Sequence, residues 1–199
     1  MSMFDKLVKY GMPFVPKFIV GRVARRYVAG DTLDDAVRTL REINREGAMG
    51  TVDVLGEEVR ESAKTTTAVD EYLRLLNRIE DEQLDANISI KPTMLGLKID
   101  ENLCADNVGK IVARATELGN FVRIDMEDHT CTDATLRLYQ KIHDEYPKSV
   151  GVVLQSYLHR TAADVNALLP RTPNIRICKG IYREPRSIAW KDFDTIRAN

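Results

Sequence analysis

Polar side chains recur where predicted parallel strands end. They are Lys91, Asp125, Glu127, Asp128, Gln155, Arg176, Lys179 and Tyr182. A buried charge is costly without a partner, so charges on successive strands must meet each other or a polar ligand. In a (β/α)₈ barrel, the loops that follow the strands build the active site. The pattern therefore predicts one polar site at one end of a sheet.

Each of these residues also has a structural explanation. Lys91 and Asp125 would form an ion pair at the end of the sheet. Asp125 would otherwise cap the following helix, although Thr132 is better placed as the N-cap. Gln155 would then satisfy only backbone groups. The repetition from strand to strand favours a site over these separate explanations.

Other chemistry finds less support in the sequence. Lys91 and Lys179 are candidates for Schiff-base formation, as in aldolases. His129 and His159 follow two of the strands and are expected to line the same site as the other polar residues. No zinc-ligand spacing supports a metal site there. His143 is expected to pack within a helix or lie at the surface. The sequence contains no GxGxxG, GxxxxGK[ST] or GxSxG motif, so neither a Gly-rich nucleotide loop nor a serine hydrolase is indicated.

Alternating helical and strand-like segments must position these residues. Strands are predicted over 50–56, 87–95, 121–126, 150–157 and 174–181, and helices over 34–46, 67–84, 103–118, 132–146, 161–169 and 190–199. Such βα repeats predict parallel strands with right-handed crossovers. Two architectures remain open, a doubly wound sheet and a (β/α)₈ barrel. Residues 1–47 are predicted to form an N-terminal helical arm and residues 48–199 an incomplete (β/α) domain.

The composition is that of a soluble globular protein. Of 199 residues, 44% are hydrophobic and 30% charged, and 29 basic minus 30 acidic residues leave a net charge of −1. No overall field attracts nucleic acid. The three cysteines are widely spaced, which favours a reducing, cytoplasmic location. The basic residues and phenylalanines near the N-terminus leave peripheral contact with the inner face of a membrane as an alternative to packing on the domain.

Several segments resemble a known family. SIKPTMLG (89–96), RIDMED (123–128), VVLQSYLHR (152–160) and RICKGIYREP (176–185) resemble successive strand motifs of the proline dehydrogenases, as do RYVAGDTLDDAV (26–37) and TVDVLGEEV (51–59). The resemblance implies a distorted (β/α)₈ barrel with FAD bound non-covalently. It also implies oxidation of L-proline to Δ1-pyrroline-5-carboxylate, with electrons passing to a quinone-type acceptor.

The resemblance assigns roles position by position. Lys91 matches a lysine that contacts the substrate carboxylate, and Tyr182 matches a substrate-binding tyrosine. Asp125 matches an acid near flavin and substrate, and Arg176 an arginine near the reactive flavin nitrogen, so both are predicted to be catalytic as well as cofactor-binding. The remaining cofactor contacts implied by the resemblance are Met126, Gln155, Lys179, Gly180 and Ile181, the last standing where the family usually has Ala.

The chain departs from the family in length. A complete barrel takes about 250 residues, whereas only five βα units are found here, so the family's sixth-strand Thr-His pair and C-terminal arginines have no counterpart. The chain is thus expected to correspond to the front part of a proline dehydrogenase. Three hypotheses remain: such an enzyme, inactive if truncated; a non-enzymatic fragment that needs a complementary piece or an oligomer; and a Schiff-base lyase that uses Lys91 or Lys179.

Overall fold

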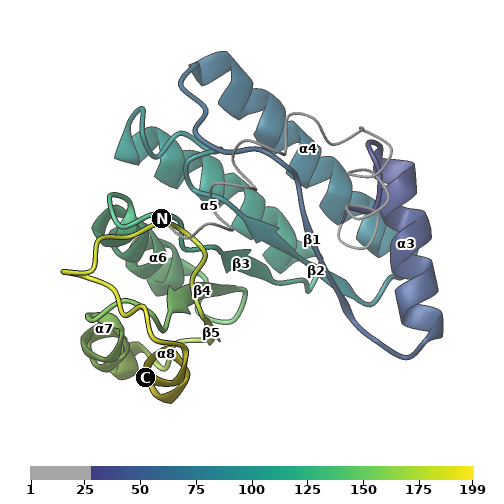
Figure 1. Ribbon diagram of the computed structural model, residues 1–199. Coiled ribbons are helices and arrows are strands. Elements are labelled where there is room, and N and C mark those ends of the chain that lie inside the picture. The colour runs from purple at the N-terminus through teal and green to yellow at the C-terminus, as the bar shows by residue number, and fades with distance from the viewer. Residues whose placement is uncertain (1–27) are drawn as a thin grey trace, which may run out of the picture.

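The computed structural model describes residues 28–199, in which helices and strands alternate (Figure 1). Of the predicted N-terminal arm (1–47), residues 1–27 lie outside the described part of the chain. In chain order the elements are α3 (Leu33–Arg45), β1 (Gly50–Asp53), α4 (Ser62–Asp81), β2 (Ala86–Ile90), α5 (Glu101–Glu117), β3 (Val122–Ile124), α6 (Thr132–Glu145), β4 (Val150–Gln155), α7 (Thr161–Leu168), the 3₁₀ turn η2 (Leu169–Arg171), β5 (Ile175–Cys178) and α8 (Phe193–Ala198).

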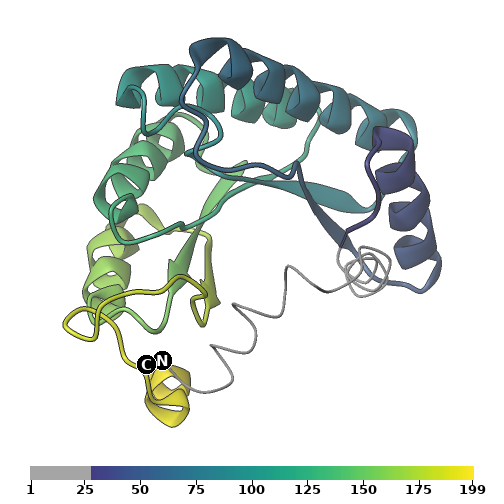
Figure 2. The same cartoon turned by 45° about the horizontal axis from the view of Figure 1, so that its top comes forward.

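The five strands form one parallel sheet. Their order is β1-β2-β3-β4-β5, the same as in the sequence. A doubly wound sheet reverses its strand order at a switch point, whereas a barrel adds each strand beside the last. The sequential order therefore decides between the two predicted architectures: the sheet is a curled half-barrel, with α4, α5, α6 and α7 along its outer side (Figure 2).

The core lies between the helices and the outer face of the sheet. Ile88 pairs in register with Val122, which pairs with Val150, and all three side chains are fully buried. Because side chains alternate between the faces of a strand, the residues one position away face the concave side. Those concave positions include Ser89, Arg123 and Arg176, so the inner face of the sheet carries polar and charged side chains.

Local sequence explains where the helices begin and end. Thr32 and Asp35 form a reciprocal capping box at the start of α3, and Gly47 follows that helix with a φ of +81°. Asp100 caps α5 through the Leu103 amide. The predicted N-cap Thr132 is instead the first residue of α6, whose N-cap is Cys131 without a side-chain hydrogen bond.

The predicted element types are correct, but several boundaries move. Helix α4 begins at Ser62 rather than 67, and strand β2 ends at Ile90 because Pro92 starts a turn that runs on to 99. The other strands are also shorter than predicted. Among the helices of residues 28–199, none combines the length and the hydrophobicity that a membrane span requires.

Candidate functional site

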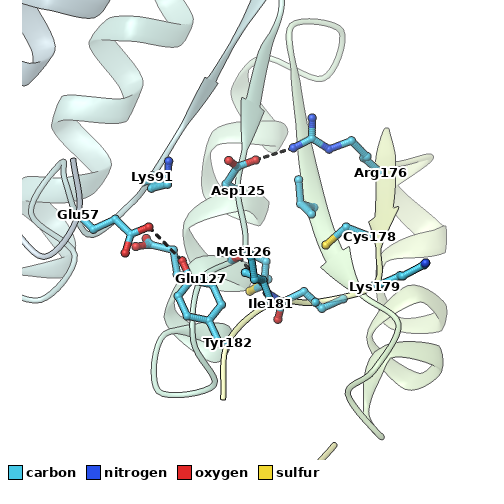
Figure 3. A pocket seen from close by; sticks show the side chains of 13 residues that line it. Glu57, Lys91, Asp125, Met126, Glu127, Arg176, Cys178, Lys179, Ile181 and Tyr182 are labelled. Atoms are coloured by element: carbon cyan, nitrogen blue, oxygen red, sulfur yellow. Dashed lines mark hydrogen bonds and ion pairs between the residues drawn. The ribbon is translucent and has the colours of Figure 1, made fainter. Parts of the chain in front are cut away.

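The predicted site residues, with the exception of Asp128, meet around one pocket of about 490 Å³ at the carboxyl ends of β2 to β5 (Figure 3). All of the residues to which the resemblance assigns a role line it, and they are Lys91, Asp125, Met126, Gln155, Arg176, Lys179, Gly180, Ile181 and Tyr182. The other lining residues are Glu57, Glu127, Val153 and Cys178. A pocket of this size is in the range of small-molecule and cofactor sites.

The pleat of the sheet explains why these side chains converge. Ser89, Lys91 and Asp125 lie at concave-face positions because they are one residue away from the buried Ile88, Ile90 and Ile124. On β5, the register places Arg176 opposite Val153 and Cys178 opposite Gln155. Four consecutive strands therefore direct polar groups toward one space.

Asp125 is held by two donors, one from β2 and one from β5. Ser89 Oγ donates to Asp125 Oδ1 over 2.6 Å, and Arg176 Nη2 donates to the same oxygen over 2.7 Å. The expected ion pair between Lys91 and Asp125 is wrong, because Lys91 pairs elsewhere. Asp125 does not cap α6 either, since the N-cap of that helix is Cys131.

Lys91 instead forms an ion pair with Asp53, the last residue of β1. The other oxygen of Asp53 accepts a hydrogen bond of 2.8 Å from the fully buried Tyr72 hydroxyl. Burial by itself lowers the pKa of the Lys91 ammonium, but Asp53, with Asp125 and Glu57 nearby, raises that pKa above its ordinary value overall. Lys91 is therefore a fixed cation, which disfavours it as a Schiff-base nucleophile because that reaction needs a neutral amine.

The side-chain amide of Gln155 makes a hydrogen bond through its nitrogen but not through its oxygen. Its Nε2 donates to the Met126 carbonyl over 3.1 Å, as the structural explanation required. Its Oε1 is buried and has no hydrogen-bond partner among the described residues. A buried unsatisfied oxygen that belongs to a pocket-lining side chain is an acceptor available to a ligand that carries an N–H or O–H group.

The segment after β5 closes one side of the pocket. Gly180 has a φ of +99°, and an added Cβ would overlap the Tyr157 ring, so glycine is required there. Ile181 is 88% exposed. The Lys179 ammonium lies over the Phe193 ring, 4.3 Å from its centroid. The Tyr182 hydroxyl donates to Glu57 over 3.4 Å, and burial, followed by the charges of Glu57 and Glu127, raises the pKa of Tyr182.

Sequence reasoning missed several residues of this site. Asp53, Glu57, Ser89 and Cys178 were not singled out. The signal for Asp53 and Glu57 was present, because both lie in the TVDVLGEEV segment at the end of β1. Ser89 and Cys178 are small side chains within strands, and only the register shows that they lie on the concave face of the sheet.

The histidines lie away from this pocket. His129 and His159 do line the same pocket, but it is a second pocket of about 240 Å³. The His129 Nδ1 contacts the carboxylate of the buried Glu184. The His159 ring packs against the Trp190 ring, with centroids 4.1 Å apart and the ring planes tilted by 50°. His143 is buried in α6 beside Tyr139. Within residues 28–199, no group of His, Cys, Asp and Glu side chains is arranged to hold a metal ion.

The sequence comparisons all match proline dehydrogenases. A sequence model of the family described as proline dehydrogenase matches residues 36–182. Proline dehydrogenase 1 of Bacillus subtilis subsp. natto is 36% identical over 169 residues, covering 85% of this chain and 56% of the relative. Proline dehydrogenase of Deinococcus radiodurans is 37% identical over 181 residues, covering 89% of this chain and 58% of the relative. The chain thus spans somewhat more than half the length of these relatives.

Solved structures share the fold. The crystal structure of proline utilization A from Bdellovibrio bacteriovorus, inactivated by N-propargylglycine, superposes with a TM-score of 0.70 at 20% identity, covering 79% of this chain and 20% of that one. A variant of proline utilization A from Bradyrhizobium japonicum superposes with a TM-score of 0.61 at 21% identity, covering 88% of this chain and 21% of that one. At this identity the likeness concerns the half-barrel and its topology.

Proposed function

This chain belongs to the proline dehydrogenase family, and from that premise we propose that its pocket binds FAD and L-proline and serves the oxidation of L-proline to Δ1-pyrroline-5-carboxylate. One observation carries the proposal: every residue that the resemblance assigned to cofactor or substrate lines the same pocket. A quinone-type electron acceptor, a cytoplasmic location with peripheral membrane contact, and oligomer formation stay predictions from the sequence.

The residues of the pocket fit a flavin. The isoalloxazine ring of oxidised FAD offers one N–H donor and several acceptors along its edge. The unsatisfied, buried Gln155 Oε1 would accept a hydrogen bond from that N–H group, which supports a hydrogen-bonding heterocycle in preference to an apolar ligand. Arg176, together with the backbone of Lys179, Gly180 and Ile181, would hold the ring on the β5 side.

When bound, FAD would accept a hydride from the carbon next to the proline nitrogen. That transfer brings negative charge to the cofactor side of the pocket, and the Arg176 guanidinium is a fixed positive charge there. Ser89 and Arg176 both donate to Oδ1 of the Asp125 carboxylate. Its role would be to orient Arg176.

The other side of the pocket would hold the substrate. Lys91 supplies an ammonium whose pKa is raised by Asp53, so it stays charged and would attract the proline carboxylate. Tyr182, hydrogen-bonded to Glu57, would close the pocket over the ring. Together these contacts would keep the donor carbon close to its acceptor. Holding two reacting groups close together supplies much of the rate enhancement of such a reaction.

The visible spectrum of the purified chain tests the proposal. FAD is added, unbound cofactor is removed, and L-proline is supplied under anaerobic conditions. We expect a retained flavin spectrum that bleaches with L-proline and does not bleach with cyclopentanecarboxylate, which has the ring and the carboxylate but no nitrogen to oxidise. Retained flavin that L-proline does not bleach, or no retained flavin, would count against the activity for this chain and favour a non-enzymatic fragment.

A further inference from the structure

Thr93 joins two loops at the rim of the pocket. It is 1% exposed and lies in the turn after β2. Its Oγ1 accepts a hydrogen bond of 3.0 Å from the Glu58 amide, and its carbonyl accepts one of 3.2 Å from the Val59 amide. One residue of the loop after β2 therefore holds two consecutive residues of the loop between β1 and α4.

Thr93 is itself held from a third loop. Glu127, which follows β3 and is buried, accepts a 2.9 Å hydrogen bond from the Thr93 amide through Oε1. The Thr93 hydroxyl donates to Glu127 Oε2. The hydroxyl thus uses its donor on Glu127 and its acceptor on Glu58, so no apolar side chain of the same shape could replace it.

The backbone that Thr93 holds is in an unfavourable conformation. Glu58 has a φ of +52°, in the left-handed region that residues with a Cβ rarely adopt. Such a conformation persists only where surrounding contacts impose it. Besides the hydrogen bond from its amide to Thr93 Oγ1, Glu58 contacts Lys98 through its side chain. The Lys98 Nζ donates to Glu58 Oε1 over 2.5 Å and to Asp128 over 3.3 Å.

The adjacent residue connects this backbone to the pocket. Glu57 lines the pocket and accepts the hydrogen bond of the Tyr182 hydroxyl. If Glu58 left the left-handed region, the chain direction at Glu57 would change, and the Glu57 carboxylate would move away from Tyr182. The conformation of Glu58 therefore determines where Glu57 and Tyr182 meet.

We propose that Thr93 is a positioning residue, which imposes the left-handed backbone of Glu58 and thereby places Glu57 and Tyr182 at the pocket. The inference rests on the proposed function only in taking Tyr182 as a substrate-binding residue. Its structural part concerns the chain without cofactor or substrate and is tested separately.

Amide hydrogen exchange, resolved to single residues, measures the structural part. In the parent chain we expect the Glu58 and Val59 amides to exchange more slowly than that of Arg60, for which the structure gives no acceptor within residues 28–199. This comparison needs no variant. In Thr93→Val, which keeps the shape and removes the hydroxyl, the Glu58 amide should exchange at least about tenfold faster.

Two variants serve as controls. Thr93→Ser keeps the hydroxyl and should retain the slow exchange of the Glu58 amide. Thr135→Val makes the same substitution at a fully buried threonine of α6 whose hydroxyl has no partner among the described residues, so it should also leave this exchange unchanged. Equal exchange in Thr93→Val and the parent, or fast exchange in Thr135→Val as well, would overturn the positioning role.

Kinetics then tests the consequence for the pocket. With FAD bound, Thr93→Val should raise the KM for L-proline roughly fivefold and change kcat less than about twofold, because only a substrate contact is displaced. Thr93→Ser should restore the parent KM. Fast exchange of the Glu58 amide with an unchanged KM would refute the link to the pocket. A parent chain that does not oxidise L-proline would refute the proposed function and leave the exchange result standing.

Discussion

Arg176 Nη2 donates to Asp125 Oδ1 over 2.7 Å, although 51 residues separate them in the sequence. Asp125 follows β3 and Arg176 lies in β5, so the contact spans the intervening β4 on the concave face of the sheet. The two side chains are 22% and 43% exposed. An ion pair this open to solvent adds little to stability, and its main effect is to fix the direction of the guanidinium in the pocket.

Replacement of this guanidinium should slow chemistry more than it weakens cofactor binding. In Arg176→Ala we expect the rate of flavin reduction by L-proline to fall roughly 100-fold, the size usual for loss of one charge-stabilising donor. The Kd for FAD should rise by no more than about threefold, since the other contacts remain. Stopped-flow reduction and a fluorescence titration with FAD measure the two effects. Equal reduction rates in variant and parent would refute the role of Arg176.

Loss of the Tyr72 hydroxyl should destabilise the chain through Asp53. Tyr72→Phe leaves one oxygen of a half-buried carboxylate without its donor, and we expect the free energy of unfolding to fall by about 1 kcal/mol. Urea denaturation measures the change. Tyr139→Phe is the matched control, because Tyr139 is equally buried but its hydroxyl donates no hydrogen bond to a described residue. The same loss in both variants would show that the contact with Asp53 contributes nothing.

Glu127 should give stability a specific dependence on pH. Burial raises the pKa of Glu127 above its ordinary value and outweighs the hydrogen bonds from Thr93, which lower it. The folded chain therefore keeps this proton to a higher pH than the unfolded chain does. Stability is lost as pH rises from the ordinary carboxyl range through the raised pKa, and it is not regained above it.

Glu127→Gln removes this titration and keeps an acceptor for the Thr93 amide. The difference in the free energy of unfolding, variant minus parent, should grow in favour of the variant across that pH window and then level off. Denaturation in urea between about pH 4 and pH 8 measures it. Glu145→Gln, at an exposed position, controls for the loss of one charge. A difference that does not vary with pH, or that shrinks as pH rises, would contradict the assignment.

The sequence predicted the order of the elements because βα alternation and helical periodicity are local properties. The βα alternation by itself left the choice between an open sheet and a barrel undecided, since that choice depends on which strands pair, and only the resemblance to the proline dehydrogenases implied a barrel. The strand order decided it. The predicted helix boundaries were less accurate where no local capping signal marks the end of the helix. Helix α4, for example, begins at Ser62 without a side-chain cap.

The site could be predicted as a set of residues but not as a set of contacts. Lys91 and Asp125 were expected to pair because both follow strands and have opposite charges. Their actual partners, Asp53 and Arg176, come from β1 and β5, and only the register of the sheet brings them into reach. Thr93 carried no signal at all, since its importance depends on a left-handed residue in another loop.

The pocket should also be detectable through the reactivity of a thiol. Cys178 lines the pocket and is half-buried, whereas Cys104 and Cys131 are buried. Burial raises the pKa of all three thiols, that of Cys104 to about 12. N-ethylmaleimide at mildly alkaline pH should therefore modify Cys178 first, because reaction requires both access and some thiolate.

Bound FAD should shield that thiol. We expect saturating FAD to slow modification of Cys178 at least about tenfold, since a ligand protects a site by the fraction of time it occupies it. The slower reaction of Cys131 should change little, which makes it an internal reference. Cys178→Ser should lack the fast phase of modification, and mass spectrometry of peptides identifies the modified residue. If FAD is retained but Cys178 reacts at an unchanged rate, the cofactor binds somewhere other than the pocket between β2 and β5.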